Sequence, residues 1–347
     1  MPAGDLDLLV RVESPYLAAA VRPAVGGRMV SLIYKSTGRQ LLYDDPKWLR
    51  LHRELGLGEH FLAFGGGIFD VVNPADGSTS YPGFVQCAAY EAKAVRTPRG
   101  RGIQVRCRRG RLEIVRRMVL AAGGPCLEIC AAYRNVGDRP IRTAPHLRIE
   151  LACSKAGDVF ITREPGGVFR YGLGGAFEPG RGFVFCRSRS SPEAVVILYR
   201  PAEDACQYTA RMSDFNLVSL QCRPVMLRPG QVAERRFLLA VVRDQQEVKA
   251  FAGRAREFLG GGVSAALDDV ALVARRARGR RGGSTPWSCT STAAGATSTR
   301  WRGQKVRRRR SALSTRRPGA GTSWWGSPRA AGMFAAGRRP VPTSGES

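Results

Sequence analysis

The feature that most constrains the fold is a long series of short apolar segments separated by turn residues. Segments such as RMVSLIYK, RLEIVRRMVLAA and AVVILYR are rich in Val, Ile, Leu and Tyr, and Gly, Pro, Asn and Asp lie between them. This composition is typical of β-strands joined by turns. Because almost no helical pattern intervenes before residue 244, the sequence predicts an all-β fold, an antiparallel β-sandwich rather than a βαβ sheet.

Helical patterns come only after the strand series. Asp244 with Glu247 three residues later forms a capping-box-like start, and the apolar residues that follow keep helical spacing. The run Gly260-Gly261-Gly262 predicts the end of this helix, and a second short helix is expected from Ser264 to about Arg278. We therefore expect a β-sandwich over residues 1–245 and a helical segment over residues 244–278.

The composition changes abruptly near Gly279. From Arg275 to the end the chain has 17 basic residues and one acidic residue, Glu346, and it holds four of the five tryptophans. No apolar periodicity survives there, which predicts a disordered tail over residues 279–347.

Two interpretations of this Arg-rich tail stay open. Basic residues interleaved with tryptophan are suited to phosphate contacts and base stacking, so the tail could bind nucleic acid. Alternatively, a GC-rich coding sequence translated in a shifted frame gives the same composition, rich in Arg, Ala, Gly, Pro, Ser, Thr and Trp. The formal charge of +27 is therefore weak evidence for a nucleic-acid partner of the whole chain.

The N-terminus has no basic start followed by a long apolar run, and no segment has the length of apolar sequence that a membrane span requires. The nine cysteines are scattered, contain no CxxC pair and lie away from the three histidines. Zinc is therefore not expected, and reduced buried thiols are. We expect a soluble, cytoplasmic protein without metal or cofactor.

One histidine lies in a segment of strand character. Residues 142–152 read RTAPHLRIELA. Because successive side chains of a strand point to opposite faces, His146, Arg148 and Glu150 are expected to share one face, and the leucines and isoleucine between them to share the other. A structural histidine beside an ordinary Arg148–Glu150 charge pair would give the same pattern, so the pattern alone does not indicate catalysis.

Four segments, taken in order, resemble the galactose mutarotase-like superfamily. They are GGRMVSLIYKSTGRQLLY, GGGIFDVVNPADG, RNVGDRPIRTAPHLRIELA and SLQCRPVMLRPGQVAERRF. The resemblance covers about residues 5 to 245 and implies a twisted β-supersandwich whose concave face holds a monosaccharide or the end of a glycan.

In the aldose epimerases of this superfamily, one histidine and one glutamate move protons at the anomeric centre. One group takes the proton of the anomeric hydroxyl while the other protonates the ring oxygen, which is general acid–base work. His146 matches the strand histidine of the family, so the resemblance makes it the catalytic candidate.

The sequence departs from the family pattern at the second group. The family's glutamate lies two residues before a glutamine, and aligning that glutamine with Gln221 places Ser219 at the glutamate position. Serine cannot hold the proton, so Glu150 is the candidate substitute. His60 is the candidate for a second histidine near the glycine loop.

Further candidate sugar ligands surround the run Gly65-Gly66-Gly67. This run lacks the strand–helix unit of a nucleotide-binding loop, so a flexible turn is its alternative interpretation. The candidates, besides Arg148 and Gln221, are Asp70, Asn73, Asp76, Tyr81 and Trp48. The motif NPADG is also good turn chemistry, and Trp48 could equally cap the sandwich.

Two functional hypotheses follow. The first is carbohydrate recognition or processing on the strand that carries His146, with aldose 1-epimerase activity through His146 and Glu150 as its enzymatic form. The second is nucleic-acid binding through the Arg-rich tail, for which charge is the only support.

Overall fold

The structure is a computed structural model. It describes residues 6–47, 50, 65–74, 84–152, 159–163, 169–171, 176–177, 182–188, 191–200, 204–211 and 216–278. The chain divides into two compact units, Met1–Ser284 and Thr285–Ser347, and the second unit lies outside the described residues. The strands and both described helices belong to the first unit. The boundaries at residues 245 and 279 stay predictions.

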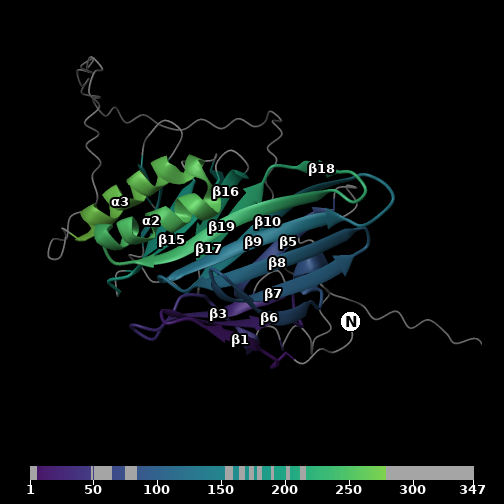
Figure 1. Ribbon diagram of the computed structural model, residues 1–347, viewed down its shortest axis with the longest axis horizontal. Helices are drawn as coiled ribbons and strands as arrows, with labels where there is room; N and C mark the ends of the chain where they lie inside the picture. The colour runs from purple at the N-terminus through teal and green to yellow at the C-terminus, as the bar shows by residue number, and fades with distance from the viewer. Residues whose placement is uncertain are drawn as a thin grey trace, which may run out of the picture. The chain divides into compact units, whose positions relative to one another are not determined.

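In the described residues the strands form two antiparallel sheets, which confirms the predicted fold class (Figure 1). The ten-stranded sheet has the order β1 (Val10–Glu13), β2 (Leu17–Arg22), β3 (Arg28–Tyr34), β5 (Gly67–Pro74), β10 (Ile141–Leu151), β17 (Asn216–Cys222), β16 (Asp204–Arg211) and β13 (Ala176–Phe177), with β4 (Arg39–Gln40) paired to β3 and β18 (Val225–Leu227) paired to β10. The nine-stranded sheet has the order β12 (Phe169–Tyr171), β11 (Val159–Arg163), β14 (Phe183–Arg187), β15 (Ala194–Tyr199), β19 (Val232–Val242), β9 (Cys126–Asn135), β8 (Leu112–Ala121), β7 (Gly100–Arg109) and β6 (Glu91–Thr97).

The two hydrophobic cores follow from the alternation of side chains along the strands. Strand β15 shows it: Val195 and Ile197 belong to the core that both sheets share, whereas Val196 and Leu198 belong to the core under the helices. A strand that is buried on both faces must be apolar at every position, which explains the unbroken sequence AVVILY. The nine-stranded sheet is thus the middle layer, between the other sheet and the helices.

Helices α2 (Gln245–Leu259) and α3 (Ser264–Arg278) form the outer layer and are joined by the short 3₁₀ helix η3 (Gly261–Val263). Figure 1 shows them next to β15 and β19. The Asp244 side chain accepts hydrogen bonds from the N–H groups of Gln246 and Glu247, and Gly260 ends α2 with φ of 88°. Both predicted helices and the predicted glycine stop are confirmed.

Strand β10 lies in the interior of the ten-stranded sheet, between β5 and β17. Residues 146–150 therefore have paired strand neighbours on both sides. The last strand of the chain, β19, is also an interior strand, because it pairs with β15 on one side and β9 on the other. A second 3₁₀ helix, η2 (Phe84–Cys87), contacts β5.

Among the described helices, none combines the length and the apolar character that a membrane span needs. None of the five cysteines that the structure describes fully forms a disulfide, and four of them are buried, as predicted. Burial raises the pKa of the Cys126 thiol to about 12 and that of Cys107 to about 11. These thiols therefore stay protonated at neutral pH.

Candidate functional site

Strand β10 separates polar and apolar side chains onto its two faces, as predicted. Leu147, Ile149 and Leu151 are fully buried in the core between the sheets. The polar side chains alternate with them and share the opposite face. This row of His146, Arg148 and Glu150, called here the β10 row, is the candidate site.

The neighbouring strands add side chains to the same face, because residues directly opposite in a sheet lie side by side. Arg148 is opposite Phe69 of β5 and opposite Ser219 of β17. His146 is opposite Gln221 of β17. Ser219, the position that matches the family's glutamate, therefore lies beside the β10 row and carries a hydroxyl group there.

Arg148 and Glu150 form a buried ion pair. Arg148 Nε donates to Glu150 Oε1 at 3.1 Å, and only 2% of the Arg148 side chain and none of the Glu150 side chain is exposed. The second carboxylate oxygen, Oε2, accepts the backbone N–H of Gly66 at 2.8 Å. Burial raises the pKa of Glu150 above its ordinary value, against the opposing effects of Arg148, Arg28 and the Gly66 N–H.

A second buried arginine shares this face. The guanidinium of Arg28 lies over the ring of Phe69, 4.0 Å from the ring centroid, and that of Arg148 lies 5.7 Å from it. Arg28 Nη1 also donates to the carbonyl of Gly66 at 3.4 Å. Two cations thus flank one aromatic ring, an arrangement that cation–π attraction stabilises.

The glycine loop is held against β10 by Glu150. Gly66 has φ of +99°, and a Cβ atom there would lie 2.2 Å from the Tyr43 carbonyl oxygen, so no larger residue fits without a shift. The backbone N–H of Tyr43 donates to the carbonyl of Glu150 at 2.9 Å. Glu150 therefore fixes two neighbouring segments at once, through its side chain and its backbone.

His146 is the partly exposed member of the row. Burial and, second, the charge of Arg148 lower its pKa to about 4. At neutral pH the imidazole is therefore uncharged, with one nitrogen that donates and one that accepts a hydrogen bond. Such a group suits hydrogen bonding to a hydroxyl, whereas it holds no proton to deliver as a cationic acid.

The spacing within the row separates His146 from Glu150. Four residues along a strand rise about 13 Å in total, and Arg148 lies between the two. An acid and a base that serve one anomeric centre must both lie within hydrogen-bond reach of adjacent sugar oxygens. The geometry therefore does not support the predicted catalytic pair of His146 with Glu150.

Asp70, a predicted sugar ligand, lies on the other face of its strand, away from the β10 row. It is opposite Leu147 in the register of β5 and β10, and its side chain is fully buried between the sheets. Its carboxylate is ion-paired with Arg116, and Oδ1 accepts the Tyr133 hydroxyl at 2.8 Å. Asp70 thus ties the two sheets together.

Arg116 and Tyr133 are buried polar groups that sequence analysis missed, and a usable signal existed. Arg116 is in phase with the core residues Ile114 and Met118 on β8, and Asp70 is in phase with Ile68 on β5. A charged residue at a core position on one strand requires an opposite charge on another. Arg116 also donates to the carbonyl of Gly27.

Other predicted ligands cannot be placed. His60, Trp48, Asp76 and Tyr81 lie outside the described residues. Asn73 and Gln221 are placed in β5 and β17 by their backbones alone. In the part of the chain that the structure describes, no cluster of three His, Cys, Asp or Glu side chains could hold a metal ion.

Solved structures share this arrangement of strands. No family model and no curated protein matches the chain. The Slr1438 protein from Synechocystis sp. PCC 6803 is 14% identical, with 69% of this chain and 97% of that chain covered and a TM-score of 0.55. A galactose mutarotase-like protein from Lactobacillus casei is 9% identical, with 68% and 100% covered and a TM-score of 0.50.

The chain has the galactose mutarotase-like fold. A GH36 α-galactosidase from Geobacillus stearothermophilus, AgaA, is also similar, at 10% identity and a TM-score of 0.53. There the similarity covers 73% of this chain and 43% of the enzyme. At these identities the likeness concerns the fold alone and leaves the chemistry to the residues of this chain.

Proposed function

We propose that the protein binds a carbohydrate on the face of the ten-stranded sheet that carries the β10 row, and that it does so without catalysing mutarotation. The observation that carries the proposal is His146, a partly exposed, uncharged histidine on an interior strand of a carbohydrate-related fold. An imidazole of this kind can exchange hydrogen bonds with sugar hydroxyls at neutral pH.

Three residues, Ser219, Glu150 and His146, are the reason to expect no mutarotation. Ser219 occupies the position where the family pattern has glutamate, and its hydroxyl does not ionise at neutral pH, so it cannot act as the general acid or base there. Glu150 lies about 13 Å from His146 along the strand, and both of its oxygens accept hydrogen bonds from protein groups. We therefore assign Glu150 a positioning role for Gly66 and Arg148.

A pair of substitutions on neighbouring residues tests the proposal. Replacing His146 with Ala is expected to weaken binding by about one hydrogen bond, roughly 0.5–1.5 kcal/mol, while the free energy of unfolding stays nearly the same. Replacing Leu147 with Ala opens a cavity in the core and is expected to cost about 2–5 kcal/mol of stability. Isothermal titration with a panel of monosaccharides and urea unfolding measure the two effects.

The outcomes separate the alternatives. If His146→Ala unfolds the domain and Leu147→Ala does not change its stability, the two faces are assigned backwards and the proposal fails. If polarimetry shows that the protein accelerates mutarotation and that His146→Ala removes the acceleration, the protein is an aldose epimerase. The nucleic-acid hypothesis concerns the Arg-rich tail, residues 279–347, and predicts binding that neither substitution changes.

A further inference from the structure

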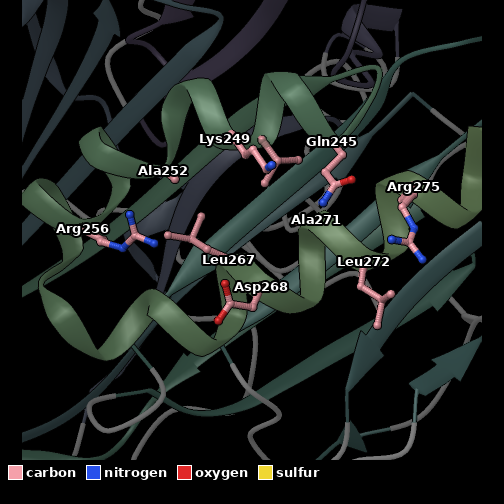
Figure 2. A pocket seen from close by; sticks show the side chains of 10 residues that line it. Gln245, Lys249, Ala252, Arg256, Leu267, Asp268, Ala271, Leu272 and Arg275 are labelled. Atoms are coloured by element: carbon pink, nitrogen blue, oxygen red, sulfur yellow. The ribbon is translucent and has the colours of Figure 1, made fainter.

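The two helices enclose a groove on the side of the molecule formed by the outer layer. Helices α2 and α3 pack against each other, and the hollow between them has a volume of about 250 Å³ (Figure 2). Val248 of α2 and Leu267 of α3, both nearly fully buried, lie at its floor. This groove, called here the α2–α3 groove, belongs to neither the β10 row nor the core between the sheets.

Small side chains make the groove hollow. Ala252 of α2 and Ala271 of α3 line it and are partly exposed. A pair of helices with larger residues at these positions would fill the space with its own side chains. An alanine on each wall instead leaves room for an apolar side chain of a third element, as in the holes that receive knobs in helical packing.

The edge of the groove is basic. Lys249, Arg256 and Arg275 line it together with a single acidic residue, Asp268, and all four side chains are exposed. Figure 2 shows Arg256 near one end of the groove and Arg275 near the other, with Lys249 between them. Arg256 Nε donates to the Ser264 hydroxyl at 3.3 Å. Because the hydroxyl is neutral, this hydrogen bond does not offset the positive charge of Arg256. The groove thus combines an apolar floor with a net charge of +2 from these four residues.

Charge selects among the possible occupants. A second copy of the same surface would bring the three basic residues of each copy together in a two-fold contact, which costs free energy. The segment of this chain that follows α3 is itself strongly basic, with 14 basic residues and one acidic residue after Arg278. Neither occupant complements the groove. An apolar floor also gives no advantage to a bare polyanion such as a nucleic acid.

We propose that the α2–α3 groove docks an amphipathic helix of another protein, one whose apolar stripe is flanked by Glu or Asp. Such a helix would place apolar side chains over Ala252 and Ala271 and carboxylates beside the basic residues. Lys249 and Arg256 are seven residues apart, which is about 10.5 Å along a helix. Acidic residues that repeat every seven positions on the partner would therefore meet both.

The test uses the full chain and three fluorescently labelled peptides. The first is a 21-residue designed helix, about six turns long, with Leu at the a and d positions of each heptad and Glu at e and g. The second has the same composition in permuted order, so that it carries the same charge without an apolar stripe. The third has Lys in place of Glu. Fluorescence anisotropy at about 0.15 M salt measures the three affinities, a salt concentration at which long-range attraction to the basic tail is screened.

We expect the first peptide to bind at least about tenfold more tightly than the permuted one, since only the first can fill the groove. The double variant Lys249→Glu, Arg275→Glu is expected to bind the first peptide about tenfold or more weakly than the wild type does, and to bind the Lys peptide more tightly. Ala271→Trp fills the groove and is expected to lower the affinity for the first peptide about tenfold. Ala252→Trp is expected to have the same effect from the other wall.

The matched control is Lys93→Glu, because Lys93 is an exposed lysine on β6 outside the groove, and this variant is expected to bind like the wild type. Thermal unfolding checks that each variant is folded. Equal affinity for the first and permuted peptides, or an affinity that the charge reversal leaves unchanged, overturns the proposal. So does an oligothymidylate that binds more tightly than the first peptide and loses its affinity in the double variant, since the groove would then be a nucleic-acid surface.

Discussion

Replacing Glu150 with Gln tests whether this residue is an anchor or a catalyst. The amide is nearly the same shape as the carboxylate, but it offers one acceptor and one NH₂ group to two donors, the Nε–H of Arg148 and the N–H of Gly66. One donor is left unsatisfied, and the buried charge of Arg148 loses this carboxylate as a partner. Removing one member of a buried ion pair costs about 3–5 kcal/mol, and we expect a loss in this range.

Equilibrium urea unfolding, followed by circular dichroism, measures the loss. The matched control is Glu13→Gln, because Glu13 pairs with Lys35 at 3.0 Å on the surface, with 65% and 40% of the two side chains exposed. An exposed pair contributes about 0–1 kcal/mol, so this control should change little. Replacing Arg148 and Glu150 together with Met removes both charges and is expected to cost less than Glu150→Gln alone.

The result that would refute the reasoning is specific. If Glu150→Gln changes the free energy of unfolding by less than about 1 kcal/mol and yet abolishes sugar binding, Glu150 is a ligand and its hydrogen bonds to Arg148 and Gly66 are incidental. An equal loss of unfolding free energy for Glu150→Gln and Glu13→Gln would show that burial does not increase the contribution of the Arg148–Glu150 pair to stability.

Three further predictions concern stability. Because the pKa of His146 is lowered from about 6.5 to about 4, the unfolded state binds a proton before the folded state does as the pH falls from 6.5 toward 4, and the protein loses stability over that range. Between pH 7 and 4, wild type should lose about 3 kcal/mol more than His146→Gln in urea unfolding. Tyr133→Phe removes the hydroxyl that Asp70 accepts and should cost about 1–3 kcal/mol by the same assay. Gly66→Ala should cost about 2–5 kcal/mol in thermal unfolding, through strain and overpacking; a smaller loss than for Gly38→Ala, whose site is open, would contradict this.

The alternation of side chains explains why much of the fold could be predicted. Leu147 and Ile149 are apolar and their neighbours are polar, so the two faces of β10 were assigned correctly from sequence alone. The helix that begins after Asp244 and ends before Gly260 was equally well marked, because caps are local signals. Such features depend on residues close together in the chain.

Features of the site that depend on contacts between distant residues could not be predicted. Asp70 follows a glycine run for which the sequence predicts a loop or turn, and no strand is predicted there, whereas β5 extends from Gly67 to Pro74 and turns Asp70 inward. Its partners Arg116 and Tyr133 are 46 and 63 residues away, so the phase of Arg116 on its own strand could mark it as buried but could not pair it with Asp70. For the same reason the sequence could not show that the backbone N–H of Gly66 donates a hydrogen bond to one carboxylate oxygen of Glu150.

The position of β19 has a consequence for synthesis of the chain. It is the last strand, yet it joins β15 to β9 in the middle of the nine-stranded sheet. After β15 is complete at Tyr199, and until residue 242 has left the ribosome, the sheet exists as two separate halves, each with an unpaired edge that can pair with another chain. The nascent protein therefore carries unpaired sheet edges, which are prone to aggregation, until β19 is made, and a chain cut short before Val232 would keep them.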